Sequence, residues 1–231
     1  LGANTTNGNS TAVGYYALKL NTAGGNTAVG ASALAANVAA GNNTAVGYVA
    51  LANSITADNT AVGTQALFAA SGADSTAVGY NALTANTGAS NTAVGSQALL
   101  ANTTGTPNTA VGYYALKTNI SGANNTAVGA NAAQNVILGN VTAIGAAALS
   151  GASGADSTAV GYSALIANTG AQNTAVGSQA LMANTSGTTN TAVGYYALKT
   201  NITGNNNTAL GASAGQSVIL GNVTAIGKSA L

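Results

Sequence analysis

The sequence predicts an all-β protein: a parallel β-solenoid (β-roll) of about fourteen 16–17-residue coils, assembled as a homotrimer. Three observations predict this fold class. A phrase of the form T-A-V-G-x-x-A-L recurs along the chain, its glycines recur at a nearly constant interval (Gly14, Gly30, Gly47, Gly63 and onward), and the residues between copies are mostly Asn, Thr, Gly and Ser. Helix-pair repeats, leucine-rich repeats and propeller blades need longer units. A solenoid coil fits this shorter period.

Each repeat is expected to comprise two short strands and a polar return. The apolar segment, such as 11–18, predicts two strands that meet at a corner. The polar remainder, such as 19–26, predicts turns, because Asn and Gly adopt left-handed backbone angles at little cost. Insertions that lengthen the period by one residue all fall in this polar part. We expect coils stacked in register about 4.8 Å apart, with like residues over like.

The repeats are themselves duplicated. Residues 72–149 and 154–231 align with a shift of 82 and differ at 14 of 78 positions. In each copy one unit lacks the leucine that usually follows the glycine, and Ala133 or Gly215 stands in its place. We therefore expect one continuous solenoid array over 1–231 with an 82-residue internal duplication. Because the chain begins at Leu1 without Met or a signal peptide, we expect it to be a segment of something longer.

The residues that recur in every repeat are small or uncharged. Two alanines and one glycine predict a narrow interior in which larger side chains would force the walls apart. The threonine that begins each phrase and an asparagine just before it predict ladders of hydrogen bonds along the stack. Solvated turns are the alternative for a minority of these polar residues. The asparagine ladder comprises Asn26, Asn43, Asn59, Asn91, Asn108, Asn125, Asn173, Asn190 and Asn207.

Two apolar ladders, valine and leucine, exceed what so narrow an interior can hold. We expect the alanines to face inward and the valines outward, because side chains alternate along a strand. An exposed apolar stripe along the stack favours self-association, and a closed trimer buries one stripe from each chain. The alternative places the leucines (Leu18, Leu34, Leu51 and onward) at the interface, and a filament is the alternative to the trimer. The predicted self-association ladder comprises Val13, Val29, Val46, Val62, Val78, Val94, Val111, Val128, Ile144, Val160, Val176, Val193, Leu210 and Ile226.

Composition excludes several classes of function. The chain has seven charged side chains, a net charge of +1, and no His or Cys. Catalysis needs an acid, a base or an activated nucleophile, and the candidates shrink to isolated Asp and Lys. Nucleic acid needs dense positive charge, and a membrane span needs about 20 apolar residues in a row. We expect no enzyme, cofactor, metal site, nucleic-acid partner or membrane span here, and we interpret Asp58, Asp74 and Asp156 as turn formers.

Tyrosine is the residue type best suited to an external contact. The tyrosines lie one or two residues after a repeat glycine, and aromatic rings stack on sugar faces or anchor protein contacts. Shielding of neighbouring coils is the alternative. The predicted contact residues are the three adjacent pairs, Tyr15 and Tyr16, Tyr113 and Tyr114, and Tyr195 and Tyr196. The lysine three residues after each pair is expected to provide solubility.

The phrase N-T-A-V-G followed by A-L resembles the head repeats of trimeric autotransporter adhesins. It is closer still to the N-T-A-V-G-Y-x-A-L repeats of large bacterial surface proteins and phage-like tail fibres, over essentially the whole chain. The resemblance implies a trimeric parallel β-roll displayed on a stalk outside the cell or at a virion tip. The unit here is longer than that of the adhesin heads, and Thr stands where their first Val stands.

These observations favour a structural and adhesive segment of an extracellular fibre or surface adhesin, stiff and multivalent. Its expected partners are further copies of itself and a surface glycan or a host or matrix protein. Its expected location is extracellular, at the cell surface, or in a virion fibre. Two alternatives remain: a self-assembling extracellular filament without a receptor, and an ice-binding solenoid that uses the threonine ladder. Ice binding requires that this threonine points outward.

Overall fold

A computed structural model of the chain describes residues 8–69, 72–151 and 154–231. Within these residues the regular secondary structure consists of short β-strands, with no helix. The chain divides into two compact units, Leu1–Ser121 and Gly122–Leu231. The first unit contains β1 (Thr11–Val13), β2 (Thr27–Val29), β3 (Thr44–Val46), β4 (Thr60–Val62), β5 (Thr76–Val78), β6 (Thr92–Val94) and β7 (Asn108–Val111). The second contains β8 (Asn125–Val128), β9 (Thr142–Ile144), β10 (Thr158–Val160), β11 (Thr174–Val176), β12 (Thr191–Val193), β13 (Thr208–Leu210) and β14 (Thr224–Ile226).

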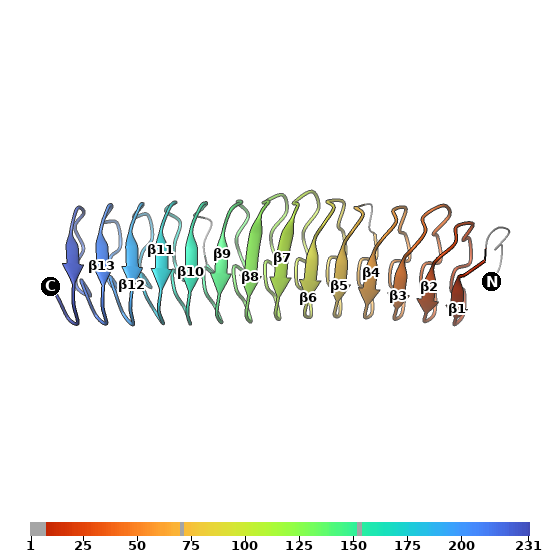
Figure 1. The fold of residues 1–231 in the computed structure, drawn as a ribbon, viewed down its shortest axis with the longest axis horizontal. Coiled ribbons are helices and arrows are strands. Elements are labelled where there is room, and N and C mark those ends of the chain that lie inside the picture. Colours follow the sequence, from red (N-terminus) through yellow and green to blue (C-terminus); the bar gives the residue numbers. More distant parts are fainter. Residues whose placement is uncertain (1–7, 70–71, 152–153) are drawn as a thin grey trace. The chain divides into compact units, whose positions relative to one another are not determined.

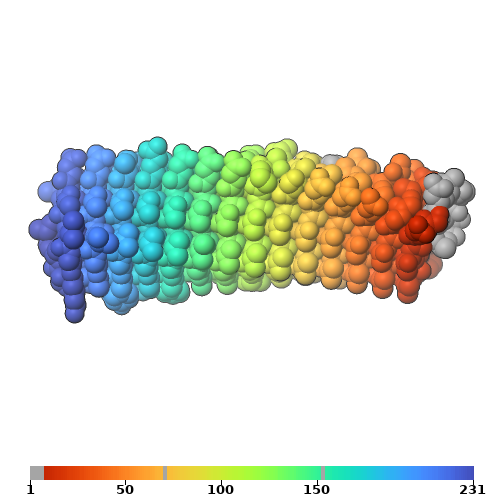
Figure 2. Space-filling view, in the orientation of Figure 1, coloured from red at the N-terminus to blue at the C-terminus, as the bar shows by residue number. Residues whose placement is uncertain are grey.

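Each unit is a parallel β-solenoid in which every coil contributes one strand to the same sheet. The strands pair in chain order and in register: Thr27 aligns with Thr44, and Val29 with Val46. Figure 1 shows the strands of each unit side by side, and Figure 2 shows the coils of each unit as stacked parallel bands. The predicted all-β parallel solenoid with a 16–17-residue period is therefore confirmed.

Each coil contains one strand, and the prediction of a second strand is wrong. The segment after the glycine is a series of turns, with φ of 57° at Tyr16 and 50° at Leu18. Its backbone still bonds to adjacent coils, because Ser32 N–H donates to Tyr15 O at 2.7 Å and Leu18 N–H donates to Ala33 O at 3.0 Å. Bonds between coils and burial of the leucine offset the cost of left-handed angles at residues other than glycine.

Alanine and leucine together form the interior. Away from the chain ends, the alanine of each T-A-V strand is buried, and so is the A-L pair after the glycine. Leu34, Leu51 and Leu67 are 0% exposed within a single chain. The interior is narrow, as the alanines predict, and the leucines fill it.

The repeat glycine is required by coil stacking, which corrects its predicted role in the interior. Gly47 has a φ of 138°, and a Cβ at this position would lie 2.5 Å from the carbonyl oxygen of Gly63 in the next coil. Glycine accepts this backbone angle and has no Cβ to collide with that carbonyl. The position therefore limits the distance between coils, whatever the width of the interior.

Two columns of buried asparagine connect the coils. In the predicted column, Asn43 N–H donates to Asn26 Oδ1 at 2.9 Å, so the carboxamide bonds to the backbone of the next coil. The second column stands three residues after the leucines. Its members bond to one another, as Asn37 Nδ2 donates to Asn21 Oδ1 at 2.9 Å, and Asn26 Nδ2 also donates to Asn21 Oδ1, at 3.0 Å. Where asparagine occupies these positions, the interior layers are hydrogen-bonded without a charged group.

Candidate functional site

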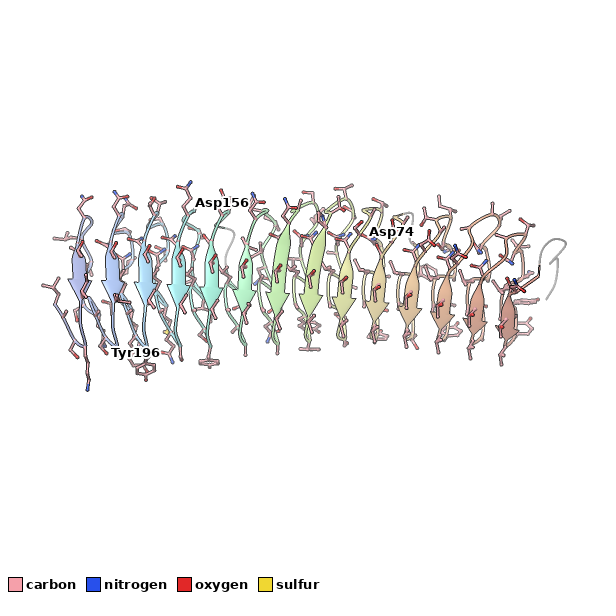
Figure 3. The ribbon with its side chains drawn as sticks, viewed as in Figure 1. Asp74, Asp156 and Tyr196 are labelled. Carbon is pink, nitrogen blue, oxygen red and sulfur yellow. The ribbon has the colours of Figure 1, made fainter. Side chains whose placement is uncertain are left out.

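Three clusters of paired tyrosines lie on the surface where the YYALK phrase occurs. In each pair the ring centroids are 3.8 Å apart and the ring planes meet at 21–29°. The second tyrosine has positive φ, 57° at Tyr16 and 61° at Tyr196, so its side chain does not alternate to the opposite face as it would in a strand. Figure 3 shows Tyr196 and Asp156 at opposite edges of the second unit.

A lysine covers the second ring of each pair. Lys117 Nζ lies 3.8 Å from the centroid of the Tyr114 ring, and Lys199 and Lys19 lie over their tyrosines at 3.8 Å and 4.3 Å. A cation over a ring face is stabilising by about 0.5–1 kcal/mol at exposed sites. The lysines therefore order the second ring, a role beyond the solubility that the sequence suggested, and leave the first ring more open to solvent.

The two phenol groups of the Tyr113–Tyr114 pair have pKa values shifted in opposite directions. The hydrogen bond with Tyr114 raises the pKa of Tyr113 above its ordinary value. The same hydrogen bond lowers the pKa of Tyr114, and the positive charge of Lys117 lowers it further. These directions match a Tyr113 hydroxyl that donates to the Tyr114 oxygen. The cluster is thus a connected group of two rings and one cation.

The first tyrosine after the glycine recurs in every second coil of the first unit. This tyrosine column comprises Tyr15, Tyr48, Tyr80 and Tyr113, each 50–68% exposed, and the coils between them carry Ala31, Thr64 and Ser96 at the same position. Backbone bonds hold the column in register: Gln65 N–H donates to Tyr48 O at 3.0 Å, and Gln97 N–H donates to Tyr80 O at 2.8 Å. In the second unit Tyr162 and Tyr195 flank Ser178 in the same way.

Sequence reasoning identified tyrosine as the contact residue type but missed the spacing of its unpaired members. Tyr48, Tyr80 and Tyr162 are 50–59% exposed, yet only the adjacent pairs were predicted as contacts. The signal was present in the sequence, since successive column tyrosines stand two repeats apart. The prediction considered only adjacent tyrosines and therefore overlooked a pattern that recurs in every second coil.

The valine ladder faces outward, in the orientation expected for it. Along the T-A-V strands the burial changes from partly exposed to buried to exposed, and Val29, Val46 and Val94 are 36–37% exposed. The leucines, with no exposed surface in a single chain, have none to offer a partner, so the alternative interface is wrong. Contact between valine ladders of different chains stays a prediction. The threonines share the outward face of the sheet.

The three aspartates occupy turns, with φ of 60° at Asp58, 54° at Asp74 and 52° at Asp156. Two of them accept hydrogen bonds from the equivalent asparagine of the preceding coil: Asn42 Nδ2 donates to Asp58 Oδ1 at 3.1 Å, and Asn140 Nδ2 donates to Asp156 Oδ1 at 3.0 Å. Asp and Asn tolerate this backbone region better than most residues. Among the described residues, no group of three or more acidic, His or Cys side chains could hold a metal ion.

Comparison with protein-family models, curated proteins and solved structures gives no significant match. In the part of the chain that the structure describes, no helix is long and apolar enough to cross a membrane.

Proposed function

We propose that this chain is a structural and adhesive segment of an extracellular fibre or surface adhesin, giving a stiff support and multivalent attachment. The observation that carries the proposal is the construction of the interior. Strand pairing joins successive coils, buried Ala with Leu in most coils fills the interior, and two columns of hydrogen-bonded Asn, interrupted at a few coils, bond neighbouring coils together. Such coils depend mainly on their neighbours, so length can grow by duplication without a new core. The 82-residue duplication is an event of this kind.

The proposed assembly is a homotrimer joined along the valine ladder. An apolar side chain in nearly every coil faces outward at the same place in the sheet, and the strands carry no charged residue. Water contact along this stripe is unfavourable, and a closed arrangement of three chains buries it for all of them. The resemblance to trimeric adhesin heads and tail-fibre repeats supports this arrangement.

Electron microscopy of the purified chain tests the proposal. Discrete particles of one length, resistant to a non-specific protease, are expected for a fibre segment of fixed size. Filaments of indefinite length would favour the self-assembling filament without a receptor. Monomeric particles that the protease degrades at the rate of an unfolded control would overturn the proposal.

Ice binding is a second candidate function, favoured by the outward threonines. Thr44 and Val46 lie on the outward face of an in-register sheet, and this pair recurs in successive coils. A regular array of hydroxyl and methyl groups is the surface that the ice-binding alternative requires. It competes with trimerisation for the same face. The test is thermal hysteresis of the recombinant chain, and a value of zero would remove this candidate.

A further inference from the structure

The tyrosine column has a regular spacing that the proposed adhesive function does not by itself explain. Neighbouring strands of a parallel sheet lie about 4.8 Å apart, so rings in every second coil repeat at about 9.6 Å. The coils between them carry smaller, non-aromatic residues at this position, Ala31, Thr64 and Ser96. The column is therefore a row of separated, exposed aromatic rings.

The surroundings of the column favour a neutral ligand rich in hydroxyl groups. The position beside it carries uncharged polar side chains in three of the middle coils, Gln65, Asn81 and Gln97. The two lysines at the ends of the column, Lys19 and Lys117, are drawn over the adjacent tyrosine rings. Aromatic rings contact the C–H faces of sugars, and amides bond to sugar hydroxyls.

The two-coil period selects among neutral polysaccharides. In a β-1,4-linked chain each sugar is turned over relative to the last, so the same ring face recurs at every second sugar, at a distance close to that of two coils. An α-1,4-linked chain curls and does not keep this straight repeat. A protein partner would not require the rings to skip alternate coils.

We infer that the tyrosine column binds the flat face of a β-1,4-linked polysaccharide such as cellulose or chitin, with the sugar chain running across the coils. One sugar stacks on each column tyrosine, and the sugars on successive tyrosines are two residues apart in the polysaccharide. The four tyrosines are Tyr15, Tyr48, Tyr80 and Tyr113. The inference rests on the proposed adhesive function and names the chemical class of its target.

The test is depletion of the 231-residue chain from solution by crystalline cellulose, by chitin and by granular starch as the α-linked control. We expect binding to cellulose, chitin or both, and at least about tenfold weaker binding to starch. The double variant Tyr48→Ala/Tyr80→Ala should lose about tenfold or more in affinity. The fold tolerates alanine here, because Ala31 occupies the same position.

Two matched variants separate spacing from aromatic content. Thr64→Tyr/Tyr80→Ala keeps four tyrosines in the column but breaks the two-coil period, and it should bind as weakly as the double alanine variant. Ile55→Ala/Ile120→Ala removes two exposed apolar side chains that lie outside the tyrosine clusters, and it should bind as the wild type does. Circular dichroism confirms that all variants are folded.

Several results would overturn the inference: no binding to either β-linked polymer, equal binding to starch, or wild-type affinity of the variant with broken spacing. Attachment to a protein-coated surface without polysaccharide binding would also overturn it, in favour of a protein partner. Discrete protease-resistant particles that bind neither cellulose nor chitin would overturn the inference but not the proposed function. Binding by a chain that forms no such particles would contradict the fibre proposal alone.

Discussion

Replacing one repeat glycine with alanine should open the stack locally, and Gly161→Ala is the sharpest case. Gly161 has a φ of 134°, and a Cβ there would lie 2.6 Å from the carbonyl carbon and oxygen of Gly177 in the next coil. Real Cβ atoms do not approach backbone atoms so closely. The atoms in contact belong to the backbone of Gly177, which cannot move aside as the end of a flexible side chain could. The two coils must therefore separate.

The free energy of unfolding should fall by about 2–6 kcal/mol. Backbone strain at such a φ costs about 1–3 kcal/mol for a residue other than glycine. Separation of the coils breaks two bonds, Gly177 N–H to Val160 O at 2.7 Å and Gln179 N–H to Tyr162 O at 2.8 Å. Each hydrogen bond contributes about 0.5–1.5 kcal/mol net. Hydrogen exchange at the two amides should accelerate before global unfolding, since solenoids open locally.

Gly215→Ala is the matched control. Its φ is 57°, and the nearest atom to an added Cβ is Leu198 Cδ2 at 3.0 Å, the mobile end of a side chain. Ala133 already occupies the equivalent position of the other duplicated segment, with a φ of 48°. We expect a change within about 1 kcal/mol. Equal losses for both variants, or unchanged exchange in Gly161→Ala, would refute the argument from coil stacking.

The remaining predictions concern the buried columns, the ladders and the tyrosine pairs. Ser54→Asn should raise the melting temperature, because the added carboxamide can donate to Asn37 Oδ1, which has no hydrogen-bond partner. The new bond should increase the free energy of unfolding by about 0.5–1.5 kcal/mol, and an unchanged melting temperature would contradict this. Leu116→Asp should unfold the coil within each chain, because Leu116 is fully buried, whereas Val111→Asp should leave the chain folded and dissociate the assembly. Circular dichroism reports the folding of each variant and sedimentation reports its assembly. Folded monomers from Leu116→Asp would show that leucine, not valine, faces the partner chain. Lys117→Met should raise the pKa of the tyrosine beneath it, because a positive charge favours the phenolate; a difference titration of tyrosinate absorbance against pH that shows no shift would remove this effect.

The solenoid and the outward valines were predictable because they depend on period. A repeat interval as short and as constant as that between successive glycines admits few folds, and T-A-V alternation determines which side chains face inward once the strand is placed. The aspartate turns followed from ordinary backbone preferences. These features need no knowledge of the path of the chain between strands.

The path after the glycine was not predictable by the same reasoning. Leucine and tyrosine rarely adopt positive φ, so the A-L segment suggested a strand, whereas Leu51 has a φ of 49°. Contacts between coils stabilise this conformation, and they are a tertiary property. The second asparagine column was hidden differently: Asn21 and Asn37 stand in polar segments whose composition suggested solvated turns, yet both are buried.

Site-specific cross-linking tests the central claim, association along the valine ladder, most directly. The chain has no cysteine, so Val94→Cys introduces a single thiol on the outward face of β6, and Asp74→Cys places one in an exposed turn of the same unit (Figure 3). If three chains associate along the valine ladder, mild oxidation should give covalent dimers from Val94→Cys and few from Asp74→Cys. The native mass of both variants should be three times 21.8 kDa. A trimeric mass without a disulfide in the Val94→Cys variant, or equal cross-linking at both positions, would contradict the account.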